Sequence, residues 1–237
     1  MDPATLKNEL VETASRRYLG AGRFAYHFAR GKLRTDPAFA ALLSAGMIPD
    51  RARILDLGCG QGLLAAWLLA AGAAEQAGRW CDAWRPPPLD WSFRGIELMA
   101  RDVERGRKAL PREALLEVGD IRSAPLGEND VVVILDVLHY MDMNNQKAVL
   151  RKVRESLSPG GRLMLRIGDA SAGLPFKISN WVDRCVLLMR GHGWVRMFCR
   201  SAAEWVDLLN STGFDSQAMP MSAGTPFANV LLVATAR

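Results

Sequence analysis

The sequence has few of the residues that build disulfide frameworks or metal sites. It contains only 4 cysteines, with no CxxC pair, at Cys59, Cys81, Cys185 and Cys199. Its 3 histidines are scattered without metal-ligand spacing, at His27, His139 and His192. Structural disulfides and zinc are therefore not expected, and we predict no metal site.

Long apolar runs are also absent. The longest nearly uncharged stretch, LLAAWLLAAGAA, falls short of the roughly 20 residues that a membrane-spanning helix needs. The N-terminal MDPATLKNEL is polar and charged, without the apolar core of a signal peptide. These absences predict a cytoplasmic protein with no transmembrane segment.

The charge balance excludes a strongly basic or acidic chain. Lysine and arginine number 30 against 25 acidic residues, a net charge of +5 in which arginine dominates. This mild excess favours acidic ligands, and nucleic acid is not expected as a partner. With 49% hydrophobic residues in 237, the chain is long enough for a sizeable core, and we favour one α/β domain over two small domains.

Strand-like apolar runs alternate with helical ones along the chain. Strands are expected at 51–58, 91–98, 114–120, 130–138, 162–169 and 227–236, and most end at or near an acid. Helices are expected at 63–71, 100–110, 146–157 and 201–214, the last with Ser201 as N-cap. This alternation predicts a doubly wound sheet whose ligand crevice lies at the carboxyl ends of the strands.

The stretch ILDLGCGQG, residues 54–62, combines a strand-end acid with a glycine turn. The part from Gly60 to Ala65 satisfies the degenerate GxGxxA pattern, which alone would suggest a nicotinamide or flavin cofactor. The full string from Asp56 through Gly58 and Gly60 to Gly62 resembles the first motif of class I S-adenosylmethionine-dependent methyltransferases. An acid beside the turn would repel a pyrophosphate but attracts the sulfonium and ammonium groups of S-adenosylmethionine.

The resemblance covers most of residues 50–236, and LSPGGRLMLR is similar to the family's motif leading into the fifth strand. It implies a Rossmann-like, doubly wound, seven-stranded and mostly parallel sheet with an antiparallel last strand. We expect an N-terminal helical cap at 1–48 and a methyltransferase domain at 49–237. Within that domain we expect an insertion at about 73–91 and an acceptor-binding elaboration at about 170–200.

The resemblance also implies a cofactor site for S-adenosylmethionine and its product S-adenosylhomocysteine. Glu97 matches the acid that accepts hydrogen bonds from both ribose hydroxyls. Asp120 matches the acceptor for the adenine amine, and Ile121 the residue packed on the ring. Residues 136–140 match those facing the methionine moiety and the methyl acceptor. The expected cofactor-binding residues are Asp56, Gly58, Cys59, Gly60, Gly62, Glu97, Leu98, Asp120, Ile121, Asp136 and Val137.

One departure from the family pattern precedes the second strand. Glu97 comes 41 positions after Asp56, against roughly 20 in a typical crossover. The excess, AGRWCDAWRPPPLDW, is rich in tryptophan and proline, which favours a semi-rigid surface elaboration or partner contact over an active-site lid. Asp82 lies 20 positions after Gly62, but no apolar strand precedes it, so Glu97 is preferred as the ribose ligand.

Methyl transfer to oxygen sets the expected catalytic chemistry. A hydroxyl acceptor needs a base, whereas a carboxylate acceptor needs none. His139 is the best-placed base, with a titration expected near neutral pH, although a pocket-lining or backbone-capping role fits it equally well. Tyr140 is expected to orient the acceptor.

Two segments that mix aromatic and basic residues, 18–34 and 180–200, are expected to bind a small-molecule acceptor. Tyr26, Tyr140, His192 and Arg196 are the expected acceptor-binding residues. The acceptor would be flat or lipid-like with an acidic handle, or linked to an acidic carrier protein. An amphipathic cover with arginines facing water is an equal alternative. GHGWVRMFCR and GTPFANVLL together loosely resemble methyltransferases found beside bacterial fatty-acid-like and aryl-polyene pathways.

The favoured interpretation is a methyltransferase acting at a hydroxyl or carboxyl oxygen. An NAD(P)-dependent oxidoreductase and a catalytically inactive cofactor-binding partner protein are the alternatives. The acid ahead of the glycines and the lack of a Tyr-x-x-x-Lys pair argue against the reductase. The complete set of cofactor positions argues against an inactive protein.

Overall fold

A computed structural model describes residues 1–176, 197–222 and 224–237. The sheet has seven strands in the order β3-β2-β1-β4-β5-β7-β6. This confirms the expected seven-stranded, Rossmann-like class. The chain divides into two compact units, Met1–Ala124 and Pro125–Arg237, which are described in turn.

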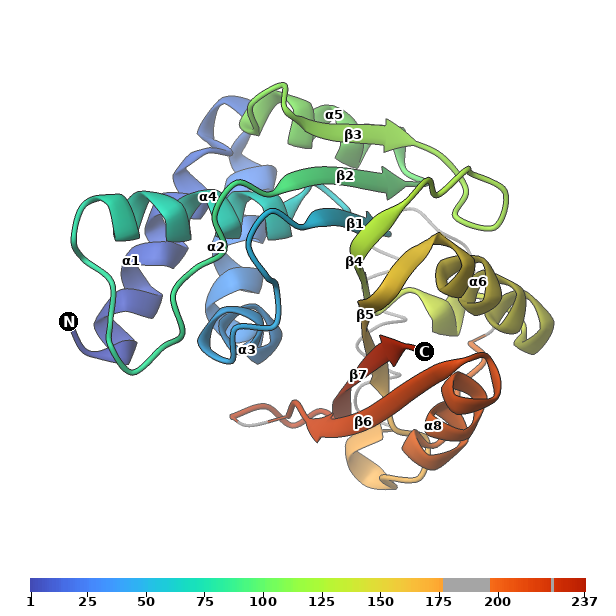
Figure 1. Ribbon diagram of the computed structural model, residues 1–237. Helices are drawn as coiled ribbons and strands as arrows, with labels where there is room; N and C mark the ends of the chain where they lie inside the picture. Colours follow the sequence, from blue (N-terminus) through green and yellow to red (C-terminus); the bar gives the residue numbers. More distant parts are fainter. Residues whose placement is uncertain (177–196, 223) are drawn as a thin grey trace. The chain divides into compact units, whose positions relative to one another are not determined.

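Three parallel strands form the sheet part of the first unit: β1 (Arg53–Leu57), β2 (Ser92–Glu97) and β3 (Ala114–Val118). Asp56 pairs with Gly95 across β1 and β2, and Glu97 with Val118 across β2 and β3. The three strands therefore run in the same direction, and their carboxyl ends meet at one edge (Figure 1).

Helices precede and connect these strands. Ahead of β1 come α1 (Pro3–Arg16), the short η1 (Leu19–Ala21), α2 (Arg23–Thr35) and α3 (Pro37–Ser44). Asp2 and Asp36 cap α1 and α3, each followed by a proline at the first helical position. The crossover helices are α4 (Leu63–Gln76) and α5 (Ala100–Ala109). Because α4 is apolar on nearly all sides, it is buried along most of its length.

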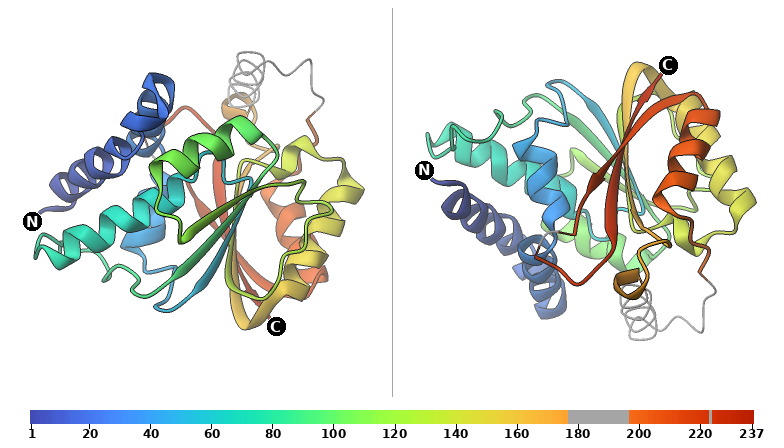
Figure 2. Two further views of the ribbon diagram at one scale, coloured as in Figure 1. Left: turned by 90° about the horizontal axis from the view of Figure 1, so that it is seen from above. Right: turned by 90° about the horizontal axis from the view of Figure 1, so that it is seen from below.

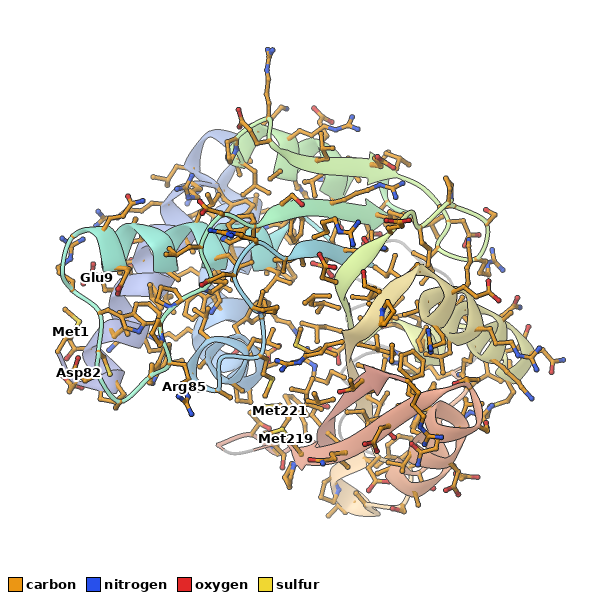
Figure 3. All side chains as sticks on the ribbon, in the orientation of Figure 1. Met1, Glu9, Asp82, Arg85, Met219 and Met221 are labelled. Atoms are coloured by element: carbon orange, nitrogen blue, oxygen red, sulfur yellow. The ribbon has the colours of Figure 1, made fainter. Side chains whose placement is uncertain are left out.

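The insertion lies at the amino-terminal edge of the strands. It begins at Ala77, four residues later than expected, because α4 continues to Gln76. The Arg85 amide donates to the Ser44 carbonyl at 3.2 Å, and Arg79 pairs with Glu9 at 2.7 Å. Figure 3 labels Asp82 and Arg85 in this segment, on the side of the unit opposite the strand arrowheads of Figure 1. The insertion is thus packed as a surface elaboration, and Asp82 follows no strand.

Four strands form the sheet part of the second unit: β4 (Asn129–Leu135), β5 (Leu157–Gly168), β6 (Phe214–Pro220) and β7 (Asn229–Ala236). β4 and β5 are parallel, and β7 is antiparallel to both of its neighbours, as expected for the last strand. The sequence interpretation assigned no strand to β6. Of its residues, FDSQAMP, only Phe214 is buried.

The described residues of the second unit include the helices η2 (Leu138–Tyr140), α6 (Met143–Ser156) and α8 (Ala202–Ser211). Asp142 caps α6, which begins three residues earlier than expected. Ser201 caps α8 as predicted, and Glu204 completes a capping box. Both α6 and α8 lie on the same face of this part of the sheet (Figure 2).

Candidate functional site

The glycine turn after β1 has a backbone in the left-handed region, which favours glycine. Gly60 and Gly62 have positive φ angles of 55° and 78°. A Cβ on Gly62 would lie 2.6 Å from Leu110 Cδ1, so this glycine allows close packing with the end of α5. A Cβ on Gly60 would meet no atom within 4 Å. The turn is therefore packed on one side and open on the other, where a ligand can approach the backbone.

Glu97, at the end of β2, is joined directly to this turn. Its Oε2 accepts a hydrogen bond from the Gly60 amide at 2.9 Å, and its Oε1 accepts one from the Met99 amide at 2.9 Å. Each carboxylate oxygen can accept a second hydrogen bond. Glu97 therefore supports the turn and can still accept hydrogen bonds from a ligand. The sequence did not predict its contact with the turn.

Asp56 is buried at the end of β1, with 5% of its surface exposed. Burial, followed by the charge of Glu97, raises the pKa of its carboxyl to about 8. Burial likewise raises the pKa of the neighbouring Cys59 thiol, which is not a nucleophile near neutral pH. The negative charge of Glu97, which acts on Asp56, favours a cation at this end of β1.

The residues after β3 form the third part of this edge. Ile121 is buried, while Leu98, after β2, is 62% exposed. The carboxylate of Asp120 binds the Arg122 side chain, with Nε to Oδ2 at 2.9 Å and a second contact at 2.5 Å. Arg122 is half-exposed, and surface ion pairs contribute little stability. Asp120 can therefore release Arg122 at small cost.

Tyr18 and Gln61 hold the turn from the N-terminal helices. The buried Tyr18 hydroxyl donates to the Gln61 carbonyl at 2.9 Å, and the Gln61 side-chain amide donates to the Ala25 carbonyl at 2.9 Å. From α5, Gly106 approaches so closely that a Cβ there would lie 2.8 Å from the Gln61 carbonyl oxygen. The N-terminal segment thus fixes the glycine turn. The sequence did not predict these contacts.

The second unit contains an ion pair directly after β4. Asp136 has a positive φ of 60° and accepts a hydrogen bond from Arg166 Nε at 2.8 Å. A second, shorter contact joins Arg166 Nη2 to the other carboxylate oxygen, so the pair is bidentate. Arg166 is 1% exposed. The buried guanidinium therefore fixes Asp136, and an arginine within the apolar run RLMLRIGD was the only sequence signal for it.

His139 lies in η2, three residues after Asp136. Its side chain is partly exposed, but Nε2 is shielded from solvent and has no hydrogen-bond partner among the described residues. Burial lowers the pKa of the imidazole to about 4, although the charge of Asp136 opposes the shift. The expectation that His139 titrates near neutral pH is therefore wrong, because the ring is desolvated.

Gln146, fully buried in α6, links η2 to residues 197–200. Its amide nitrogen lies within hydrogen-bond distance of three carbonyl oxygens, at 2.8 to 3.1 Å, those of Leu138, Met141 and Phe198. Its oxygen accepts from Arg200 Nε at 3.0 Å, and the Phe198 amide donates to the His139 carbonyl at 2.8 Å. This network holds the backbone around His139. It could not be predicted, because it joins residues that are far apart in the sequence.

The other expected site residues divide by location. Val137 and Tyr140 lie beside His139 in the second unit, and the Tyr140 ring contacts the His139 ring edge-on at 4.0 Å. Tyr26 lies on α2 in the first unit and is partly exposed. The predictions for His192 and Arg196 fall outside the described residues.

Across residues 1–176, 197–222 and 224–237, no helix combines the length and apolar character that a membrane crossing needs. Over the same ranges, no three histidine, cysteine or acidic side chains gather as a metal site requires.

A strand-end acid, a glycine turn and a second acid on the next strand define the class of S-adenosylmethionine-binding α/β proteins. The model of a methyltransferase domain family matches residues 26–218. The chain belongs to this family, and its cofactor is accordingly S-adenosylmethionine. The expected membership in the S-adenosylmethionine-dependent methyltransferases is confirmed.

Individual relatives are more distant. The carboxy-S-adenosyl-L-methionine synthase of Glaesserella parasuis is 29% identical over 124 residues, which is 52% of this chain and 48% of that protein. The chain spans about half the length of the curated relatives it matches.

Solved structures share the fold. Magnesium protoporphyrin IX methyltransferase from Synechocystis, solved with S-adenosylhomocysteine, has a TM-score of 0.60 at 19% identity, covering 94% of this chain and 93% of its own. Mitomycin 7-O-methyltransferase has a TM-score of 0.60 at 21% identity, covering 89% and 56%.

Proposed function

We propose that the protein transfers the methyl group of S-adenosylmethionine to a hydroxyl or carboxyl oxygen of a small-molecule acceptor. The observation that carries this proposal is the arrangement of Asp56, the open glycine turn and Glu97 at one edge of β1 and β2. An acid-lined turn of this kind suits a ligand with two positive charges better than a pyrophosphate.

The residues at this edge fit the cofactor chemically. Glu97 has a free lone pair on each carboxylate oxygen for the ribose hydroxyls. Asp120 would accept the adenine amine after releasing Arg122, with Ile121 and Leu98 as apolar neighbours of the ring. The backbone of Gly58, Cys59, Gly60 and Gly62 would approach the methionine moiety, and Asp56 would balance its positive charge. Asp136 and Val137 are proposed to complete the cofactor site.

The bound cofactor supplies a methyl group already activated on a sulfonium, so the chain itself has to orient the acceptor and limit water. We propose His139 as the group that receives the proton of a hydroxyl acceptor. Tyr140, Tyr26, His192 and Arg196 are proposed to orient an acceptor with an acidic handle. A carrier-protein-linked acceptor fits the same basic residues. Mitomycin 7-O-methyltransferase, which shares this fold, is an example of transfer to oxygen.

Glu97→Ala should weaken S-adenosylmethionine binding by about 1.5 to 3 kcal/mol, the range for hydrogen bonds to a charged group. The loss has two sources, the ribose contacts and the support of the Gly60 amide. Isothermal titration of wild type and variant measures it. Asp82→Ala, in the exposed insertion, is the matched control and should leave the affinity unchanged.

Two results would contradict the proposal. The first is equal or tighter binding of NAD together with no response to S-adenosylhomocysteine. The second is a larger loss of affinity in Asp82→Ala than in Glu97→Ala, which would mean that Asp82 and not Glu97 binds the ribose.

S-adenosylmethionine binding near neutral pH should release a proton from Asp56. With a pKa of about 8 in the free protein, the carboxyl is mostly protonated at that pH, and a nearby cation lowers the pKa. Affinity should therefore rise as pH increases from about 6 to about 8, where Asp56 is largely ionised in the free protein. Titration calorimetry in buffers of different ionisation enthalpy measures the released proton.

Uncharged adenosine serves as the control ligand and should release no proton. Asp56→Asn should remove the proton release for S-adenosylmethionine. Equal release in this variant and in wild type would show that another group titrates.

A further inference from the structure

One face of α2 carries a continuous line of basic side chains. Arg23, His27, Arg30 and Arg34 are spaced at i, i+4, i+7 and i+11, which places them in one row along the helix. We call this row the α2 basic stripe. At about 1.5 Å per residue it extends for roughly 16 Å. A row of this length matches several successive turns of another helix.

The stripe faces away from the core. Ala25, Ala29 and Leu33, on the other side of α2, are fully buried and hold the helix against its unit. Arg23 and Arg34 are exposed and form no salt bridge with a described residue. The stripe is therefore available to a partner without disturbing the helix packing.

Positive charge on this face exceeds the negative charge that compensates it. Arg30 pairs with Glu12 of the adjacent α1 at 2.6 Å. The hydrogen bond from Arg30, with smaller contributions from Arg16 and Arg34, lowers the pKa of the Glu12 carboxyl. Three guanidinium groups therefore gather around one carboxylate, and residues 13–35 contain no acid. The excess charge favours an anionic partner.

The aromatic side chains beside the stripe narrow the kind of partner. Phe24 is 53% exposed, but Arg105 lies 4.4 Å from its ring centroid and Phe28 stacks on it at 5.9 Å. Because Arg105 and Phe28 already contact the Phe24 ring, this ring is not free to insert into a bilayer or to stack on a nucleic acid base. Phe24 and the exposed Leu19 instead offer a small apolar margin next to charge, as at the rim of a protein interface.

We propose that the α2 basic stripe docks an acidic helix of a partner protein. Carboxylates one turn apart on that helix would pair with the exposed arginines, and its apolar side would contact Phe24 and Leu19. The stripe lies within segment 18–34, which was expected to bind the acceptor, but its arginines have no assigned part in cofactor binding. The proposal therefore goes beyond the proposed function by assigning them to a protein partner.

The test uses the full-length protein and a synthetic helical peptide of about 20 residues. The peptide carries glutamates at i, i+4, i+7 and i+11, and a scrambled peptide has the same composition. Fluorescence anisotropy should show binding of the first peptide, stronger than that of the second. Arg23→Glu/Arg34→Glu should weaken it roughly tenfold or more, because like charges then oppose each other.

Arg112→Glu/Arg151→Glu, two exposed arginines outside the stripe, is the matched control and should retain binding. The proposal is overturned if the peptide does not bind or if both double variants lose binding equally. It is also overturned if a DNA duplex or a phosphatidylserine vesicle binds the stripe more tightly than the peptide. S-adenosylmethionine titration should be unchanged in both double variants, which separates this test from that of the proposed function.

Discussion

Asp136→Asn should lower the free energy of unfolding by about 3 kcal/mol, the lower end of the range for breaking a buried ion pair. Asparagine tolerates the positive φ of 60° at this position, so the backbone is not strained. The loss arises because Arg166, 1% exposed, loses the carboxylate that compensates its buried charge. Urea denaturation without cofactor measures the difference.

The other residue of the ion pair is expected to be less sensitive to substitution. Arg166→Met should cost less than Asp136→Asn, because the Asp136 side chain is 30% exposed and can be solvated. The double variant Asp136→Asn/Arg166→Met should recover much of the loss, since no charge then remains buried. Asp215→Asn, at an exposed position of β6, is the control and should change the free energy of unfolding by no more than about 0.5 kcal/mol. Additive losses in the double variant would disprove the pairing.

The arrangement of Asp56, the glycine turn and Glu97 at one edge of the sheet was predictable because its signals are local in sequence. Asp56 and Gly62 lie within one strand-turn-helix unit, and Glu97 ends an apolar strand. Parallel strands then bring these acids to one edge whatever the length of the insertion. The N-cap at Ser201 was predictable for the same reason, since capping depends on the next few residues.

The supporting contacts were not predictable, because they join residues far apart. Tyr18 and Gln61 are 43 residues apart, and Gln146 reaches Phe198 across 52. The two donors, Tyr18 and Gln146, belong to no motif, and each binds a backbone carbonyl, which every residue has. Strand β6 was missed because only its first residue, Phe214, is buried and the strand is held by pairing with β7. Tertiary pairing outweighs local preference in such strands.

The protonation state of His139 could not be predicted from the sequence. Position after a strand end suggested a base, but pKa depends on desolvation, which sequence does not report. A pKa of about 4 means that the imidazole is neutral throughout the physiological range. It is then always ready to accept a proton but is a weak base, so its effect on rate should not titrate near neutral pH.

His139→Ala should lower kcat for a hydroxyl acceptor by about 10²- to 10⁴-fold with little change in cofactor affinity, because a general base acts on the transition state. In wild type, loss of the neutral imidazole should reduce the rate only as pH falls through about 4. Initial rates across pH, read by mass gain of one methylene on the acceptor, measure both effects.

His139→Gln separates proton transfer from support of the site, since glutamine fills similar space and keeps a hydrogen-bonding side chain but cannot accept the proton. If His139 is the base, glutamine should be as damaging as alanine, whereas Tyr140→Phe should mainly raise KM. If His139 only lines the pocket, glutamine should restore most of the rate. A carboxylate acceptor needs no base, so nearly full activity in both His139 variants would identify carboxyl methylation and remove His139 from catalysis.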